Sequence, residues 1–206
     1  DVLADGVAWA ARALPSRPSI PTLSGVLISS DDSELTLSGF DMEQAARVQV
    51  EATIDEPGHV LVSGRLLADI ARSLPAAPVV IATEGSRLEV QCGRSSFVLP
   101  TLPVDEYPQL PEMPAPVGSV GGSVFAHAVA QVAIAAGRDD TLPMLLGVRL
   151  EIEDDRVTMA ATDRYRLAVR EFTWNPEQSG FQGAALVPAK ILNDTAKLLA
   201  GAKRVS

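Results

Sequence analysis

The feature that most constrains the fold of this 206-residue chain is that its first half recurs in its second half. Two offsets relate the copies, 122 positions at first and 125 positions farther along. The matching segments are Leu23–Val26 with Leu145–Val148, Asp41 with Asp163, and Leu61–Asp69 with Leu186–Asp194. Steady offsets with a single small step indicate a tandem duplication. Both halves are therefore expected to adopt the same fold.

A proline-rich stretch separates the two copies. It contains Pro103, Pro108, Pro111, Pro114 and Pro116, and such a composition predicts an extended, stiff connector. We therefore expect a first domain over residues 1–103, a linker over 104–117 and a second domain over 118–206. The chain starts within what reads as a helix, and the second copy stops soon after its second helix. A strand before Asp1 and the last strands after Ser206 are thus expected to be missing.

Each copy reads as a helix, a group of strands and a second helix, and the first copy then continues with further strands. Apolar residues recur at helical spacing over residues 2–14 and 65–74 in the first copy, and over 124–136 and 189–199 in the second. Short runs of apolar and β-branched residues between these helices predict strands. The sequence therefore predicts an α+β protein in which each domain packs two helices on antiparallel sheets.

The second helix of each copy carries the same polar stripe opposite its apolar face. The stripe is Arg65–Asp69–Arg72 in the first copy and Lys190–Asp194–Lys197 in the second. Ion pairs along a helix surface contribute only about 0.2–0.5 kcal/mol each, so the stripe does little for stability. The four helical stretches together carry a formal charge of +4, which leaves −13 of the net charge of −9 to the strands and loops. An alternative explanation of these cations is that they belong to ordinary solvated helix faces with no binding role.

Several classes of protein are not favoured by the sequence. The one cysteine, Cys92, cannot form an internal disulfide and reads as a small core residue. No signal-peptide pattern opens the chain and its apolar runs are too short to cross a bilayer. We therefore expect a cytoplasmic protein with no membrane partner.

An enzyme is also not favoured. Asp139, Asp140 and Asp163 could be imagined as metal ligands, but adjacent carboxylates point in different directions and no Glu/His cluster accompanies them. His59 and His127 lack zinc-site spacing. Phosphate-binding loops, nucleophile elbows and dinucleotide fingerprints are all missing from the sequence. We expect no catalytic residue, no metal and no cofactor.

Several motifs together resemble one family. They are Arg17-Pro18, Pro21–Gly25, Val62–Leu67, Thr101–Pro103, Glu106–Pro108, Arg138–Leu145 and Ala161–Val169. These segments are similar to the first two domains of the bacterial DNA polymerase III β subunit, the β sliding clamp. The resemblance implies three clamp domains per chain and two chains joined head to tail in a ring. Helices would line a central hole for duplex DNA, and the two domains here would form a pseudo-symmetric arc. The third domain is absent from this sequence.

The resemblance implies a replication processivity factor that performs no bond chemistry. A closed ring cannot fall off a long duplex, so it keeps the polymerase near the primer end. Its lining must attract phosphate without reading bases. The residues expected to face the DNA are Arg12, Arg17, Arg65, Arg72, Arg138, Lys190 and Lys197. An acidic exterior would keep DNA from binding outside the ring.

The resemblance also implies two protein interfaces. The DNA polymerase III catalytic subunit, the clamp loader and other proteins with clamp-binding motifs would dock a short peptide in an apolar groove. The groove residues carried over are Leu145, Thr162, Arg164, Tyr165, Arg166 and Leu167. The homodimer would close through the edge strand of residues 94–99, using Arg94, Phe97 and Leu99. An alternative for the interface residues is that Leu145, Leu167 and Phe97 are plain core residues. An alternative for the whole chain is a repeat scaffold that binds proteins but no DNA.

Overall fold

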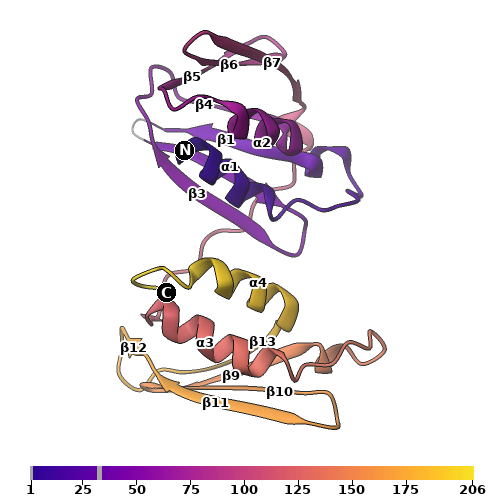
Figure 1. Ribbon diagram of the computed structural model, residues 1–206, viewed down its shortest axis with the longest axis vertical. Helices are drawn as coiled ribbons and strands as arrows, with labels where there is room; N and C mark the ends of the chain where they lie inside the picture. The colour runs from indigo at the N-terminus through magenta and orange to yellow at the C-terminus, as the bar shows by residue number, and fades with distance from the viewer. Residues whose placement is uncertain (1, 32–33) are drawn as a thin grey trace. The chain divides into compact units, whose positions relative to one another are not determined.

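The computed structural model describes residues 2–31 and 34–206, and the chain divides into two compact units, Asp1–Glu112 and Met113–Ser206 (Figure 1). The boundary between the units falls within the proline-rich stretch. The start of that stretch belongs to the first unit. There η2 (Val104–Glu106) is fastened by a hydrogen bond of 3.2 Å from the Thr22 hydroxyl to the Glu106 carbonyl.

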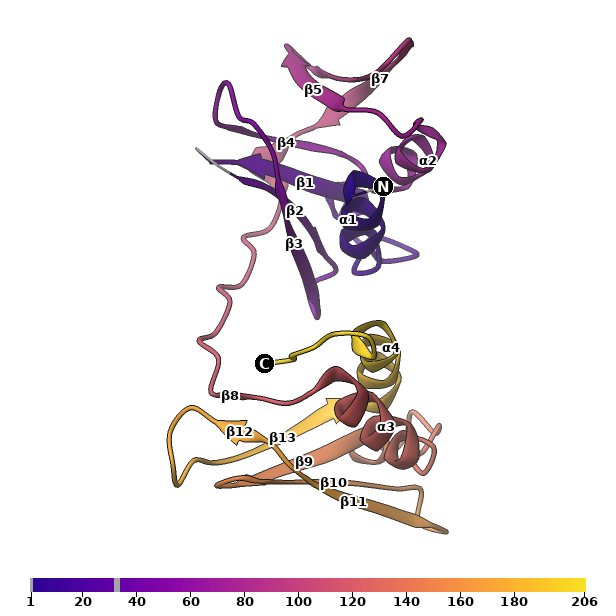
Figure 2. The same ribbon diagram turned by 60° about the vertical axis from the view of Figure 1, so that its left-hand side comes forward.

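The first unit contains two α-helices and seven strands among its described residues. In chain order these are α1 (Val2–Ala11), η1 (Pro21–Ser24), β1 (Gly25–Ser30), β2 (Glu34–Phe40), β3 (Ala45–Glu51), β4 (Gly58–Ser63), α2 (Gly64–Ser73), β5 (Val79–Glu84), β6 (Arg87–Cys92) and β7 (Ser95–Leu102). The strand order is β3-β2-β1-β4-β7-β6-β5, and neighbouring strands are antiparallel. The helices α1 and α2 lie on the same side of this sheet (Figure 2).

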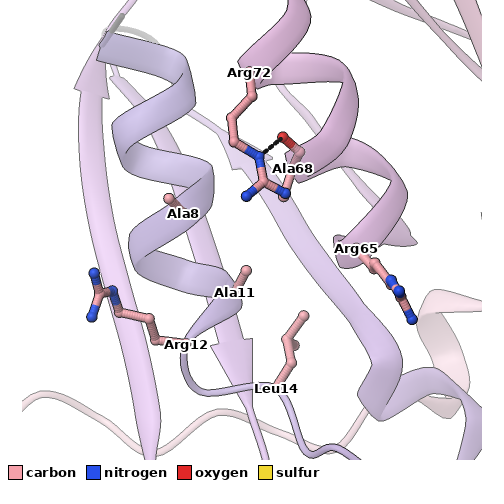
Figure 3. Close-up of a pocket in the computed structure, with 7 residues that line it drawn as sticks. All are labelled: Ala8, Ala11, Arg12, Leu14, Arg65, Ala68 and Arg72. Atoms are coloured by element: carbon pink, nitrogen blue, oxygen red, sulfur yellow. Dashed lines mark hydrogen bonds between the residues drawn. The ribbon is translucent and has the colours of Figure 1, made fainter. Parts of the chain in front are cut away.

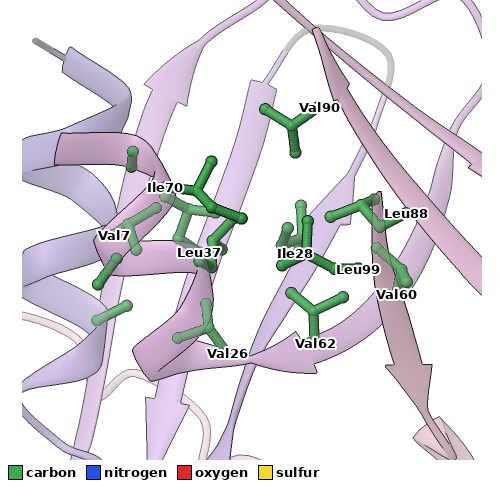
Figure 4. Close-up of a cluster of buried hydrophobic side chains, with 14 of the residues drawn as sticks. Val7, Val26, Ile28, Leu37, Val60, Val62, Ile70, Leu88, Val90 and Leu99 are labelled. Atoms are coloured by element: carbon green, nitrogen blue, oxygen red, sulfur yellow. The ribbon is translucent and has the colours of Figure 1, made fainter. Parts of the chain in front are cut away.

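The core of the first unit lies between its helices and its strands (Figure 4). Val7 from α1 and Leu67 from α2 are fully buried against strand residues such as Leu37, Val62 and Leu88. The approach of α1 to β2 requires a glycine, because a Cβ at Gly39 would collide with the Ala10 carbonyl oxygen. Apolar burial of this kind is the main force that holds the helices in place.

The second unit repeats this plan. Its elements are β8 (Gly118–Ser119), α3 (Gly122–Ala133), η3 (Pro143–Leu145), β9 (Gly147–Glu153), β10 (Arg156–Thr162), β11 (Leu167–Thr173), β12 (Asn175–Pro176), β13 (Gln182–Pro188) and α4 (Ala189–Leu199). The main sheet has the order β11-β10-β9-β13, and β12 pairs with β8. Both helices cover one face of the main sheet (Figure 2), with Val129, Val132 and Met159 fully buried in the core.

The predicted α+β fold, with two helices against antiparallel sheets in each half, is confirmed. The first helix is shorter than predicted. It ends at Ala11, and the backbone N–H groups of Arg12, Ala13 and Leu14 then bond three residues back rather than four. This tighter turn closes the helix ahead of the proline-marked loop.

The prediction that residues 94–99 end the sheet of the first unit is wrong as stated. In the strand order β7 lies between β4 and β6. Its contact with β4, however, involves only Thr101 and Leu102, whereas Ser95–Pro100 pair with β6 alone. The first part of β7 therefore keeps one side without a paired strand among the described residues.

Candidate functional site

The two helices of the first unit frame an open hollow of about 410 Å³. Its lining consists of Ala8, Ala11, Arg12, Leu14, Arg65, Ala68 and Arg72. Ala8 and Ala11 of α1 face Ala68 of α2, and these small side chains leave a space that larger side chains would fill. Three of the seven lining residues are arginines, so the hollow attracts anions.

The three arginines are held differently. Arg72 donates from Nε to the Ala68 carbonyl at 3.1 Å and from Nη2 to the Asp69 carboxylate at 2.5 Å. Figure 3 shows its guanidinium between the two helices, with Arg12 and Arg65 extending on their far sides. Among the residues that the structure describes, no acidic side chain lies within ion-pair distance of Arg12 or Arg65. These two cations remain available to an anionic ligand.

The second unit carries a related but weaker cationic surface on α4. Lys190 and Lys197 are exposed, and Lys197 contacts Asp194 at 3.4 Å. The position equivalent to Arg12 is Ile134, which is 66% exposed. Both units thus present two cations on the second helix, whereas only the first unit adds one from the end of the first helix.

A second hollow, of about 400 Å³, lies within the second unit. It is lined by Gly137, Arg138, Asp139, Leu142, Leu145, Asp163, Arg164 and Tyr165. Leu142, Leu145 and Tyr165 provide apolar and aromatic surface, while the charged groups stand beside it. This combination suits a short peptide with an apolar anchor.

The turn between β10 and β11 shapes one wall of this hollow. Asp163 accepts hydrogen bonds from the N–H groups of Tyr165 and Arg166, at 3.1 and 3.0 Å, and from Arg166 Nε at 2.9 Å. The Thr162 hydroxyl donates to the Arg166 carbonyl at 2.7 Å. Arg164 has a φ of 81° and its guanidinium carbon lies 6.0 Å from the centre of the Tyr165 ring. The network fixes a backbone that an L-residue rarely adopts.

Two carboxylates of the hollow are stabilised in their charged form. Burial by itself raises the pKa of Asp163, but hydrogen bonds from Arg166 and Tyr165 and the charge of Arg166 outweigh it and leave that pKa lowered. Hydrogen bonds from Thr141 lower the pKa of Asp139, and the charge of Arg164 adds to this effect. Arg164 therefore acts electrostatically on the opposite wall of the hollow.

The structure brings together part of the predicted groove. Leu145, Arg164 and Tyr165 line the hollow, and Thr162 and Arg166 build its turn. Leu167 is 68% exposed, so it is not a core residue. Sequence reasoning did not assign Gly137, Asp139, Leu142 or Asp163 to the groove, although the match of Asp163 to Asp41 across the repeat was a signal that could have drawn attention to it.

Two of the residues predicted to face DNA, Arg138 and Arg17, do not line the hollow between α1 and α2. Arg138 lines the second hollow with the groove residues. It follows α3 in a loop whose Gly137 N–H donates to the Leu145 carbonyl, which draws the loop toward the groove. Arg17 is exposed in the loop after α1 and lines neither hollow.

The predicted dimer residues differ in accessibility along β7. Arg94 is exposed, Phe97 is half-buried against the core, and Leu99 is fully buried. Strand alternation points the Leu99 side chain inward, and the place of Leu99 at a dimer interface stays a prediction. The open backbone of Ser95–Pro100 is the part of this strand that could receive another strand.

Neither a metal site nor a membrane-spanning helix is found within residues 2–31 and 34–206. No group of three His, Cys, Asp or Glu residues is placed to hold a metal ion. None of the helices in this part of the chain has the length and apolar character needed to span a bilayer.

Family models match both units. The DNA polymerase III beta subunit N-terminal domain matches residues 1–111, and the central domain of the same subunit matches residues 119–206. The beta sliding clamp of Streptomyces coelicolor is 62% identical over 205 residues, which is 100% of this chain and 54% of that protein. That of Micrococcus luteus is 50% identical and covers 97% of this chain and 64% of its own length. The chain thus spans less than two thirds of these relatives.

Solved structures show the same fold. The DNA polymerase sliding clamp of Bacillus subtilis gives a TM-score of 0.88 at 26% identity and covers 95% of this chain and 54% of its own. The Pseudomonas aeruginosa sliding clamp bound to griselimycin gives 0.87 at 30% identity, over 99% of this chain and 56% of that one.

Proposed function

This chain belongs to the DNA polymerase III beta subunit family, and from that premise we propose that it forms the first two domains of a DNA sliding clamp. The clamp would be a homodimeric ring around duplex DNA that keeps the replicative polymerase on its template. The observation that carries the proposal is the match of the two units, in order, to the N-terminal and central domains of that subunit. The proposed role involves no bond chemistry and places the protein in the cytoplasm.

The cations of the helices support a role in holding DNA. Arg12, Arg65 and Arg72 line one hollow of the first unit, and Lys190 and Lys197 lie on α4 of the second. Phosphate contacts hold DNA without reading its sequence, so a few dispersed cations attract a duplex and still let it move. The charge of −13 outside the helical stretches disfavours DNA elsewhere on the surface.

The hollow of the second unit supports a role in binding partner peptides. Leu142, Leu145 and Tyr165 would receive apolar anchors, while Arg138 and Arg164 stand ready for polar groups of the peptide. The polymerase catalytic subunit, the clamp loader and other clamp-binding proteins are the proposed partners. A repeat scaffold that binds no DNA is not favoured by the family match.

Ring closure is proposed to use the open backbone of β7. Ser95–Pro100 pair with β6 on one side only, and an edge of this kind can accept a strand of another chain. Phe97 supports this strand from the core side. A third clamp domain, as implied by the family, would supply the other half of the contact.

Retention on DNA of different topology tests the proposal. The protein joined to a third clamp domain and loaded onto closed circular DNA should remain bound through gel filtration, and it should be lost once the circle is linearised. Replacing Arg12 and Arg65 by Gln should weaken the retention. The matched control replaces Arg47 and Arg170 by Gln, which removes the same two charges at exposed positions of β3 and β11 outside both hollows. Equal retention on circular and linear DNA would contradict ring formation.

A further inference from the structure

The helices α2 and α4 are aligned copies that share few residues. Over Gly64–Ser73 and Ala189–Leu198 the identical residues occupy three positions, which are Leu67/Leu192, Asp69/Asp194 and Ala71/Ala196. The leucine and alanine positions are buried in the two cores, which explains why they are alike. The aspartates are 60% and 58% exposed, so core packing does not explain them.

Each aspartate holds one cation of its own helix. Asp69 contacts Arg72 at 2.5 Å and Asp194 contacts Lys197 at 3.4 Å, both three positions along the helix. The cation changed from arginine to lysine between the copies, yet the pair remained. Lys190 and Arg65, at the other end of each stripe, have no acidic side chain within ion-pair distance among the described residues.

Stability does not account for the repeated pair. Both partners are more than half exposed in each unit, and such pairs contribute about 0–1 kcal/mol. Each aspartate also lies in the middle of its helix, where the partial positive charge of the helix N-terminus is no longer felt. What the aspartate does change is charge, because it cancels one of the two cations on its helix.

We propose that Asp69 and Asp194 are attenuating residues, which engage Arg72 and Lys197 in ion pairs and so weaken the grip of each helix on duplex phosphate. This inference rests on the proposed function. A ring that slides must hold DNA loosely, since every cation that binds phosphate firmly adds to the energy needed to move along the duplex. With the aspartate present, Arg72 or Lys197 must give up a partner in order to contact DNA.

The expected size of the effect follows from the release of counterions. Each phosphate neutralised changes the slope of log K against log salt by about 0.9. One added contact on a helix therefore raises affinity by about threefold at moderate salt. The two aspartates lie in separate units, so the double substitution should raise affinity by about tenfold.

The test compares Asp69→Asn, Asp194→Asn and the double variant with the parent chain. Binding to a fluorescein-labelled duplex of about 20 base pairs is followed by anisotropy from low to moderate salt. Each single variant is expected to bind more tightly and to show a steeper salt dependence, and the double variant more so. Thermal unfolding of all variants should stay close to that of the parent.

The matched control is Glu151→Gln. Glu151 forms an ion pair with Arg149 at 2.5 Å, as short as that of Asp69 with Arg72, and both side chains are exposed, but the pair lies on β9 of the sheet. The control changes net charge by the same amount and should leave DNA affinity nearly unaltered. An equal gain in this control would show a bulk charge effect and overturn the inference.

The sign of the result separates the possible failures. If the aspartates positioned the cations for phosphate, the Asn variants would bind more weakly, which would overturn the inference and leave the proposed function intact. Unchanged affinity would have the same meaning. If neither the parent nor the double variant bound duplex at the lowest salt, the inference would be overturned, whereas the proposed function would still be decided by retention of the closed ring on circular DNA.

Discussion

Between β2 and β3 the first unit turns at Asp41–Gln44, and between β10 and β11 the second unit makes the equivalent turn at Asp163–Arg166. In both, the aspartate accepts hydrogen bonds from the N–H groups two and three residues on and from the side chain of the third residue. The residue after the aspartate has a φ of 79° at Met42 and 81° at Arg164. The two turns are thus nearly the same backbone structure.

Their surroundings differ. In the second unit the turn faces Leu145, which is half-buried and lines the hollow, whereas the equivalent Leu23 is fully buried in the first unit. The first turn presents Met42 and Glu43 where the second presents Arg164 and Tyr165. The aspartate therefore fixes the backbone in both copies, and the residues carried on that backbone decide whether it serves a binding site.

The strand before each turn offers the largest expected difference between the units. Gly39→Ala should lower the free energy of unfolding by about 1–3 kcal/mol, because the new Cβ would meet the Ala10 carbonyl oxygen. The equivalent residue of the second unit is already Ala161, which is buried without such a collision. Chemical denaturation of Gly39→Ala and of Ala161→Gly measures the change in the free energy of unfolding at each of the two equivalent positions. A Gly39→Ala variant as stable as the parent would show that α1 can move away from β2 at little cost.

The aspartate of each turn offers the next largest difference. Asp163→Ala should weaken binding of a labelled peptide with leucine and phenylalanine anchors by about tenfold, since the turn that carries Arg164 and Tyr165 loses the three hydrogen bonds that fix it. Asp41→Ala removes the matching bonds in the first unit and should leave peptide binding unaltered. Titration by fluorescence anisotropy compares the two. A similar loss in both variants would argue that the hollow of the second unit is not the docking site.

The smallest expected effect concerns the positive φ of the next residue. Arg164→Gly should be more stable than Arg164→Ala by about 1 kcal/mol, because glycine alone adopts this backbone without strain. Met42→Gly and Met42→Ala should differ by the same amount. Thermal unfolding of the four variants tests whether the turns are equally strained. A difference at Met42 but not at Arg164 would mean that the backbone at position 164 can leave the positive φ at little cost.

Much of the fold could be predicted because the same sequence pattern occurs in both halves of the chain. The offsets of 122 and 125 residues locate each element in both copies, and apolar spacing identifies all four helices. The end of α1 could not be predicted, since residues 12–14 continue the apolar spacing but lie in a tighter turn. The role of β7 in two pairings was also hidden, because pairing depends on contacts distant in the sequence.

For the candidate site, the sequence predicted which residues take part better than it predicted their burial and position. The paired cations of α2 and α4 follow directly from helical spacing. Leu99 and Phe97 read alike in sequence, yet one is fully buried and the other half-buried, because burial depends on what packs above the strand. Arg138 was grouped with the helix cations, but the loop after α3 carries it to the peptide hollow.

The position of β7 affects how the first unit unfolds locally. The hairpin of β5 and β6 is joined to the remaining strands only through β7, within the part of the chain that the structure describes. Amide protons in β5 and β6 can therefore be no better protected from exchange with solvent than this strand allows. A partner that pairs along Ser95–Pro100 would slow the opening of the whole hairpin, so that assembly and local unfolding would be governed by the same few backbone groups.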